Sequence, residues 1–468
     1  MVGLSAAEAA SRRFVLVGLA SFALAAAVIA PLGAVAPVAA ATGWADFGTP
    51  TATSSFTAGV TFSQPVDVGR EVGRTELLLT AATAAGPTVI EVPGPTGTGA
   101  TTLTYVVDPN VDGHMLPNTP LTGRWRLTAA DDPTDVEVGP AIQITYADDR
   151  FGWRTEADDL VKVHWYEGSS GFGQRALTIA NDAVQQAADL LHVTESDPID
   201  FFVYADQDAF YAALGPGTRE NVGGQANAEI RTMFALIPTS EIDQAWVGIV
   251  IPHELTHLVF DTAASNPYHF PPRWLNEGLA VYLSQGYDAS DRGAVESSAS
   301  AGTLIPLDGL TGQFPTSYDR FSLAYAESVS AVDYLIRAHG RDPLVSLIRS
   351  YADGHTDDEA FSAALGVDMS AFGTAWLDDL GAAAPTRYGP QSAPPGPIPS
   401  AWLGAAGASP AAGSSGGTSG PGVPPGPGGG TGSEITGATL AVLLIVIVVG
   451  AIVVIVTVRR RRARPRSS

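Results

Sequence analysis

The chain has 468 residues and no cysteine, which excludes a small disulfide-stapled scaffold and a catalytic thiol. Eight of its 25 basic residues lie within the first 13 and the last ten positions, so the region between carries 17 basic against 47 acidic residues. A surface this acidic repels nucleic acid and anionic lipid, and we expect no nucleic-acid partner for the central region.

Residues 1–41 have the pattern of a secretory signal peptide. Arg12 and Arg13 precede an apolar stretch from Phe14 to about Ala30, and a run of small residues follows, as at a cleavage site. The apolar region is longer than a typical signal core, so a retained N-terminal anchor is the alternative.

Residues 42–149 consist of short β-rich runs separated by clusters of Gly, Pro and Asp. This spacing predicts a small all-β sandwich. Residues with useful chemistry do not cluster in it, so we interpret it as a spacer or an interaction module whose partner is unknown.

Residues 150–385 first alternate between strand and helix patterns and then become mainly helical, which predicts an α+β domain with a mixed sheet and a helical C-terminal lobe. The stretch Glu229–Ile237 alternates like an edge strand, where an extended peptide could add itself by backbone hydrogen bonds. An ordinary sheet strand without substrate contact fits equally well.

The central helix of this domain is predicted to open at Ser240–Asp243, which offers an N-cap and an acid at the third position. Pro252 disagrees with a simple helix, because it lacks a backbone donor and its ring presses on the carbonyl of Gly248. The helix therefore either bends or begins at Pro252.

His253-Glu254-Leu255-Thr256-His257 reads H-E-x-x-H, the signature of zinc proteases. A helix places both histidines on one face, and Glu277, which follows a Pro-rich turn, supplies a third ligand. We predict that His253, His257 and Glu277 bind one Zn²⁺ ion and leave the fourth position to water. A buried polar cluster without metal is the alternative, at a cost of several kcal/mol.

Glu254 lies about 100° around the helix from His253, so it is not a ligand on the same face. It is placed to act as the general base that takes a proton from the water activated by the metal and passes it to the leaving amine.

The run Trp274-Leu-Asn-Glu-Gly-Leu-Ala280 resembles the third-ligand helix of gluzincin metallopeptidases, especially the aminopeptidase-N-like branch and the bacterial peptidase MA-like domains. The resemblance covers about residues 150–385. In the aminopeptidase branch a tyrosine in a Tyr-x-x-Gly/Ser context stabilises the oxyanion. Tyr325-Ala-Glu-Ser328 matches this context, which implies a catalytic Tyr325; a packing tyrosine is the alternative.

The chain also departs from these relatives. The Gly-x-Met-Glu-Asn element that grips a free amino terminus is absent, which favours an endopeptidase over an aminopeptidase. The acid expected four residues after the third ligand is replaced by Val281. Asp261 could orient a ligand imidazole, or it is a solvated acid at the helix end. His269 could contact substrate, or it is an ordinary loop histidine.

The C-terminal part predicts a membrane anchor. Residues 386–435 form a linker rich in Pro, Gly and Ser, residues 436–458 an apolar helix long enough to cross a bilayer, and residues 459–468 a basic tail. The positive-inside rule places the tail in the cytoplasm and the rest outside the cell, as in a single-pass type I membrane protein.

The sequence therefore predicts an extracellular, membrane-anchored zinc metallopeptidase that hydrolyses peptide bonds in a peptide or protein substrate. The alternative, from a different class, is a catalytically silent cell-surface binding or scaffold protein that contains zinc.

Overall fold

The computed structural model describes residues 43–82, 86–215, 223–266 and 268–387. The predicted signal peptide, the apolar C-terminal helix, the basic tail and nearly all of the linker lie outside these ranges. Among the described residues, no helix combines the length and the apolar character needed to cross a membrane.

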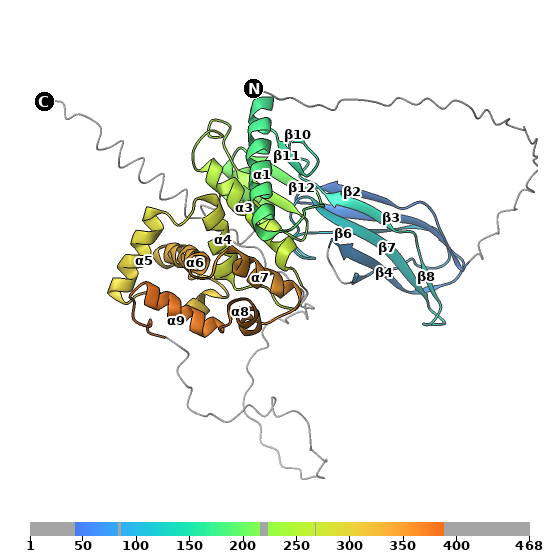
Figure 1. The fold of residues 1–468 in the computed structure, drawn as a ribbon. Coiled ribbons are helices and arrows are strands. Elements are labelled where there is room, and N and C mark those ends of the chain that lie inside the picture. Colours follow the sequence, from blue (N-terminus) through green and yellow to red (C-terminus); the bar gives the residue numbers. More distant parts are fainter. Residues whose placement is uncertain (1–42, 83–85, 216–222, 267, 388–468) are drawn as a thin grey trace, which may run out of the picture.

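An all-β sandwich begins the described chain (Figure 1). One antiparallel sheet holds β1 (Ala45–Phe47), β2 (Thr51–Ser55), β3 (Gly59–Val68) and β6 (Gly99–Val107). The other holds β4 (Val72–Ala81), β5 (Thr88–Val92), β7 (Thr119–Ala129), β8 (Val136–Val138) and β9 (Ile142–Tyr146). Alternate side chains of β3 and β7, including Phe62 and Trp125, point inward and form a common core.

A third, mixed sheet follows, with strands in the order β10 (Arg154–Ala157), β11 (Val161–Trp165), β12 (Ile199–Tyr204), β14 (Thr232–Leu236) and β13 (Gly224–Asn227). The pairs β11–β12 and β12–β14 are parallel, and the two outer pairs are antiparallel. Helices α1 (Ser170–Leu191) and α3 (Val247–Ala264) pack on one face (Figure 1), while α2 (Gln207–Leu214) contacts β12 and β14.

The mixed sheet is buried on both faces at β14. Met233 and Ala235 of β14 belong to the core shared with α1 and α3, whereas Phe234 belongs to the core of the sandwich. The prediction that Glu229–Ile237 contains an edge strand is therefore wrong, because β14 is paired on both sides by β12 and β13. The edge strand is β13, which covers β14 on that side.

Charged and aromatic groups fix the crossing from the sandwich to the mixed sheet. Arg150 donates from Nε and Nη2 to the two carboxylate oxygens of Asp148, at 2.8 and 2.6 Å. The Tyr204 hydroxyl of β12 donates to Asp148 at 2.9 Å, and the Arg150 guanidinium lies 4.0 Å from the centre of the Phe56 ring. These contacts join the sandwich, the crossing segment and the mixed sheet in one packed unit.

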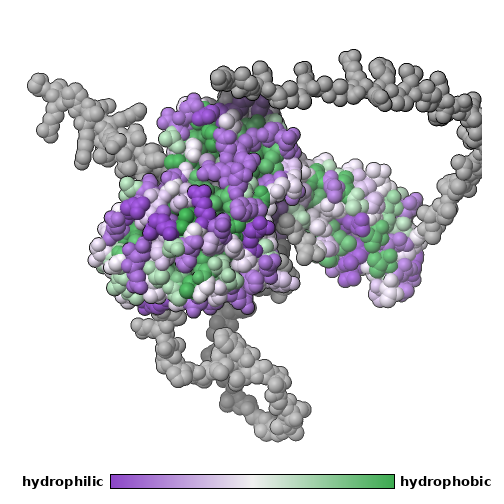
Figure 2. Space-filling model, in the orientation of Figure 1, coloured by the Kyte–Doolittle hydropathy of each residue, from purple (hydrophilic) through white to green (hydrophobic). Residues whose placement is uncertain are grey.

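A helical lobe completes the described chain and consists of α4 (Arg273–Ser284), α5 (Ala289–Ala301), the 3₁₀ turn η1 (Leu307–Leu310), α6 (Tyr318–His339), α7 (Arg341–Ala352), α8 (Asp357–Leu365) and α9 (Met369–Asp379). The predicted fold class, an α+β zincin-like domain preceded by an all-β sandwich, is confirmed. Hydrophilic residues cover much of α1 and of the lobe on the face shown in Figure 2.

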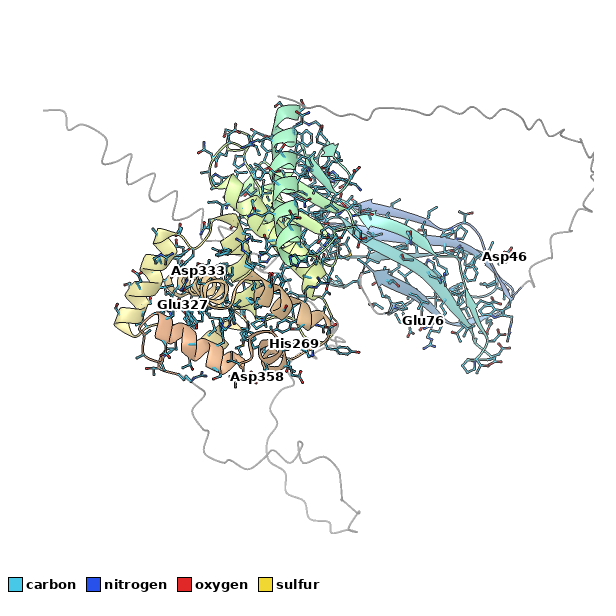
Figure 3. The ribbon with its side chains drawn as sticks, in the orientation of Figure 1. Asp46, Glu76, His269, Glu327, Asp333 and Asp358 are labelled. Carbon is cyan, nitrogen blue, oxygen red and sulfur yellow. The ribbon has the colours of Figure 1, made fainter. Side chains whose placement is uncertain are left out.

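Inside the lobe, Glu327 of α6 is fully buried (Figure 3), and its carboxylate accepts the backbone N–H of Ile305 at 3.0 Å. Burial raises the pKa of Glu327 to about 8. This contact ties the segment after α5 to α6.

Helix α3 begins at Val247, so the prediction that Ser240–Asp243 opens it is wrong. Residues 238–244 form turns instead, and the Glu241 carboxylate accepts the Trp246 indole N–H at 3.0 Å rather than a helix amide. Pro252 lies inside the helix, five residues after its start, so the helix does not begin there.

Helix α4 approaches the backbone of α6 at Gly278, the residue after Glu277. A Cβ atom at Gly278 would lie 2.4 Å from the carbonyl oxygen of Ser328. Only glycine allows this approach, because the obstacle is backbone, which cannot turn aside as a flexible side chain can.

Replacing Gly278 with alanine should therefore lower the free energy of unfolding of residues 43–387 by about 1–3 kcal/mol, measured by urea denaturation. Gly293→Ala in α5 is the matched control, since a Cβ there meets nothing within 4 Å. The control should be neutral or stabilising by up to about 1 kcal/mol. Equal stability of both variants would contradict the close contact between α4 and α6.

Candidate metal centre

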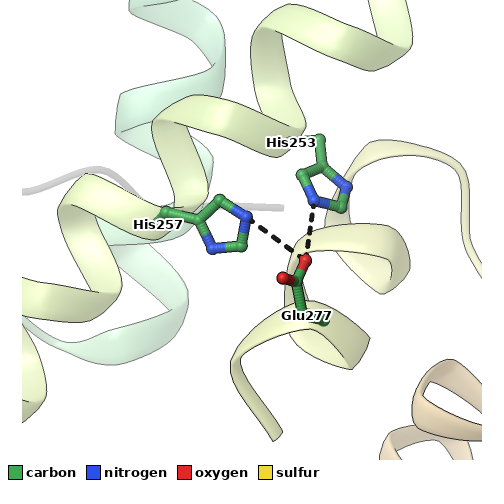
Figure 4. A group of neighbouring side chains, drawn as sticks. All are labelled: His253, His257 and Glu277. Atoms are coloured by element: carbon green, nitrogen blue, oxygen red, sulfur yellow. Dashed lines mark ion pairs between the residues drawn. The ribbon is translucent and has the colours of Figure 1, made fainter. Parts of the chain in front are cut away.

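Helix α3 presents His253 and His257 on one face, one turn apart, with ring centroids separated by 4.9 Å (Figure 4). The neighbouring side chains Leu255, Leu258 and Val259 are fully buried, so the helix runs through the core rather than along the surface. Both imidazoles therefore point into the protein interior.

Helix α4 supplies the opposing group. Oε2 of Glu277 lies 3.5 Å from Nε2 of His253 and 3.5 Å from Nε2 of His257 (Figure 4). One ligand atom from each of the three residues lies within 4.8 Å of the others. The structure thus brings together the three predicted ligands from two separate helices.

The residues fit a metal ion. Nε2 of both histidines and Oε2 of Glu277 are buried and have no hydrogen-bond partner among the described residues. Such unpaired atoms are costly, and one cation between them would satisfy all three. Zinc bonds of 2.0–2.1 Å in a tetrahedron imply donor separations of about 3.4 Å, close to those observed. Two imidazoles and one carboxylate are a donor set for one zinc ion with an open fourth position.

Burial also prepares the imidazoles to act as ligands. It lowers the pKa of His253 to about 3 and that of His257 to about 4. Both rings are therefore neutral at neutral pH, the form that binds metals. Nδ1 of His257 donates to Oδ1 of Asn276 at 2.9 Å, which leaves the lone pair of Nε2 free for the ion.

Glu254 lies beside this centre and next to the edge strand β13. A Cβ atom at Gly224 would come within 2.8 Å of Cγ of Glu254, so the glycine provides the space for the glutamate. Glu254 is fully buried, and burial together with the nearby Glu277 carboxylate raises its pKa well above the usual range. A cation at the ligands would oppose this shift and favour the carboxylate.

Tyr325 reaches the same place from α6. It is buried, and its hydroxyl donates a hydrogen bond to the Glu277 carboxylate. The rings of Phe314 and Phe321 pack on it with centroids at 5.3 and 5.1 Å. Burial and the carboxylate of Glu277 raise the pKa of Tyr325 well above its usual value, so the phenol remains a donor.

Two further sequence candidates have other partners. Nε2 of His269, which is labelled in Figure 3, forms a hydrogen bond with Oδ1 of Asp357 at 3.0 Å. Asp261 is near Arg231 and Glu195, and the hydrogen-bond partner of His257 is Asn276. Neither residue contacts the three ligands through a described hydrogen bond or ion pair.

Sequence reasoning gave no role to Gly224, Asn276 or Arg273. Asn276 stands in the quoted motif beside Glu277, which was a usable signal. Arg273 donates from Nε and Nη2 to Oε1 of Glu277, both at 3.2 Å, and its spacing of four residues from Glu277 was the available sign. The role of Gly224 depends on a contact between distant parts of the chain.

Comparison with known proteins finds a family model that matches the part of the chain with this centre. Residues 179–382 match the family model described as the Peptidase MA superfamily. A comparison with curated proteins gives no match.

Solved structures share a distant overall similarity. An aminopeptidase N family protein from Idiomarina loihiensis is 11% identical, with a TM-score of 0.36, over 71% of this chain and 76% of that one. An M1 zinc metallopeptidase from Deinococcus radiodurans is 12% identical, with a TM-score of 0.34, over 75% and 97%. A mutant M1 zinc metallopeptidase from Deinococcus radiodurans, bound to a Tyr-Ser-Ala substrate, is 11% identical, with a TM-score of 0.35, over 72% and 94%.

The similarity to the Peptidase MA superfamily comes from the matched model, not from these distant structures. The matched region contains α3, α4 and α6, which carry the three ligand candidates, Glu254 and Tyr325. The part of the chain that is similar to the Peptidase MA superfamily is therefore the part that holds the candidate metal centre.

Proposed function

We propose that the chain is a zinc-dependent peptidase that hydrolyses peptide bonds. The observation that carries this proposal is the convergence of three unpaired, buried ligand atoms beside a buried glutamate. The match of residues 179–382 to the Peptidase MA superfamily model supports the same chemistry.

A zinc ion held by His253, His257 and Glu277 would polarise the scissile carbonyl and lower the pKa of a water molecule to near neutrality. In the proposed reaction Glu254 takes the proton of the attacking water on its carboxylate and then delivers it to the leaving amine. The Tyr325 hydroxyl, protonated and oriented by Phe314 and Phe321, exchanges its contact with Glu277 for the developing oxyanion.

The edge strand β13 supports a mode of substrate binding. It is the last strand of the mixed sheet and runs beside Glu254, so an extended peptide could pair with its backbone next to the catalytic base. The four residues of β13, from Gly224 to Asn227, include no acid that would bind a terminal ammonium group. We therefore favour internal cleavage over removal of the N-terminal residue.

The proposed location is the cell surface, with the peptidase outside. This proposal is supported by the sequence alone, through the signal-like residues 1–41, the apolar residues 436–458 and the basic residues 459–468.

Replacing Glu254 with glutamine should lower kcat/KM by about 10²–10⁴-fold while one zinc ion per chain remains bound, because the base is lost but the ligands are not. Cleavage is measured by mass spectrometry on a peptide library in free and N-acetylated forms, with zinc content determined in parallel. Glu327→Gln is the matched control, since it changes a buried glutamate of the lobe outside the site and should retain activity.

Equal cleavage of free and acetylated peptides is expected from an endopeptidase, and exclusive cleavage of free peptides would contradict that preference. A wild-type chain that binds zinc and cleaves nothing in the library would favour a silent binding or scaffold protein instead.

Tyr325→Phe should reduce kcat by about 10²–10³-fold, with little change in KM or zinc content, because one donor to the oxyanion is removed. Steady-state kinetics on a peptide identified in the library measures this effect. Tyr334→Phe removes a hydroxyl from the same helix, where the ring packs on Phe372, and should leave kcat unchanged. An unaltered kcat in the Tyr325 variant would assign that residue to packing.

Ending the chain after Gly432 should convert a membrane-bound protein into a released one, because the apolar segment is removed. The measurement is the distribution of full and shortened chains between membranes and medium. Protease added to intact cells should degrade the full chain's peptidase domain. Protection of that domain, or a soluble full chain, would overturn the proposed topology.

A further inference from the structure

We propose that Arg273 is a positioning residue of the metal centre, which occupies one oxygen of Glu277 so that a single oxygen remains for the ion. This inference rests on the proposed function and concerns how the third ligand is presented. Arg273 thereby keeps the fourth position open for the reaction.

The two oxygens of Glu277 have separate surroundings. Oε1 accepts two hydrogen bonds from Arg273, from Nε and from Nη2, each at 3.2 Å. Oε2 has no hydrogen-bond partner among the described residues and lies 3.5 Å from Nε2 of each ligand histidine. The carboxylate therefore shows one face to the arginine and one atom to the metal position.

Arg273 is itself held in place. Its backbone N–H donates to the carbonyl of Thr311 at 2.9 Å, and its guanidinium carbon lies 4.4 Å from the centre of the Phe314 ring. Its side chain is 11% exposed, unlike that of a mobile surface arginine. Phe314 also packs on Tyr325, so one aromatic ring supports both groups that contact Glu277.

Two donors in a fixed fork resist rotation of the carboxylate more than one donor does. Without them, Tyr325 is the one remaining donor described for Glu277, and the carboxylate can turn more easily to offer both oxygens to the ion. A second oxygen would fill the open position that catalysis requires. The ion pair with Arg273 also compensates the buried charge of Glu277 in the absence of metal, which reduces the desolvation free energy of this carboxylate.

The competing interpretation is an ordinary ion pair between residues four apart on a helix. The chain offers a matched example in α6, where Nε of Arg337 lies 2.8 Å from Asp333, away from the metal ligands. An effect seen for Arg273 and absent for Arg337 therefore reports on the metal centre rather than on helix stability.

The test uses the full chain, purified in detergent, as wild type and as the variants Arg273→Gln, Arg273→Lys and Arg337→Gln. Zinc affinity is measured by competition with a chromogenic chelator, and coordination by the visible absorption of the cobalt(II)-substituted protein. We expect Arg273→Gln to weaken zinc binding about 10–100-fold. We also expect its cobalt bands to become less intense, as they do when four-coordinate sites gain a fifth donor. Arg273→Lys should recover part of the affinity, because it restores the charge without the fork, and Arg337→Gln should match the wild type.

Wild-type zinc affinity and an unchanged cobalt spectrum in Arg273→Gln would overturn the proposal. If that variant does not fold, Phe314→Leu provides the second test, since it removes the ring beneath the guanidinium and keeps both charged partners. It should shift the cobalt spectrum in the same direction, and an unchanged spectrum would again overturn the proposal. Failure of the proposed function is distinguishable, because the wild type itself would then cleave no peptide while its zinc affinity still depended on Arg273.

Discussion

The structure depends on holding one carboxylate oxygen 3.5 Å from each of two imidazole nitrogens, in a core where none of the three atoms has a hydrogen-bond partner in the described chain. This arrangement is unfavourable without a cation, so packing must impose it. The apolar neighbours of His253 bury α3, and the backbone contact at Gly278 sets α4 against α6. The ligands are therefore placed by helix packing and not by their own attraction.

Electrostatics and packing act together in this centre. Burial keeps the two histidines neutral and opposes ionisation of Glu254 and Glu277, and a divalent cation between them would favour the ionised carboxylates. The elements around the ligands divide the remaining tasks. Helix α6 brings a protonated phenol, Asn276 of α4 orients one imidazole, and Gly224 of β13 leaves space for the Glu254 side chain.

Much of this was accessible from the sequence, because it depends on local spacing. The H-E-x-x-H pattern fixes which side chains share a helix face, and a short Pro-rich turn returns the chain to present Glu277. Contacts between distant segments were not accessible. Which strand forms the edge is set by the order of pairing in the sheet, which places β13 outside β14. The Glu241 carboxylate accepts the Trp246 indole N–H instead of capping a helix, a contact that the capping pattern does not reveal. The fork of Arg273 on Glu277 depends on side-chain rotamers, and the Arg273 guanidinium packs on the ring of Phe314, which is distant in the chain.

The mixed sheet has one face in each of two cores, and this affects what counts as a domain. Tyr204, Phe210 and Phe234 lie in the core of the sandwich although they follow it in the chain. A fragment that lacked the sandwich would expose these aromatic side chains to solvent. The sandwich therefore completes the hydrophobic core on this face of the mixed sheet. Strand β14 packs on the sandwich through Phe234 and is paired with β13. The sandwich therefore supports the edge of the sheet where we propose that a peptide binds.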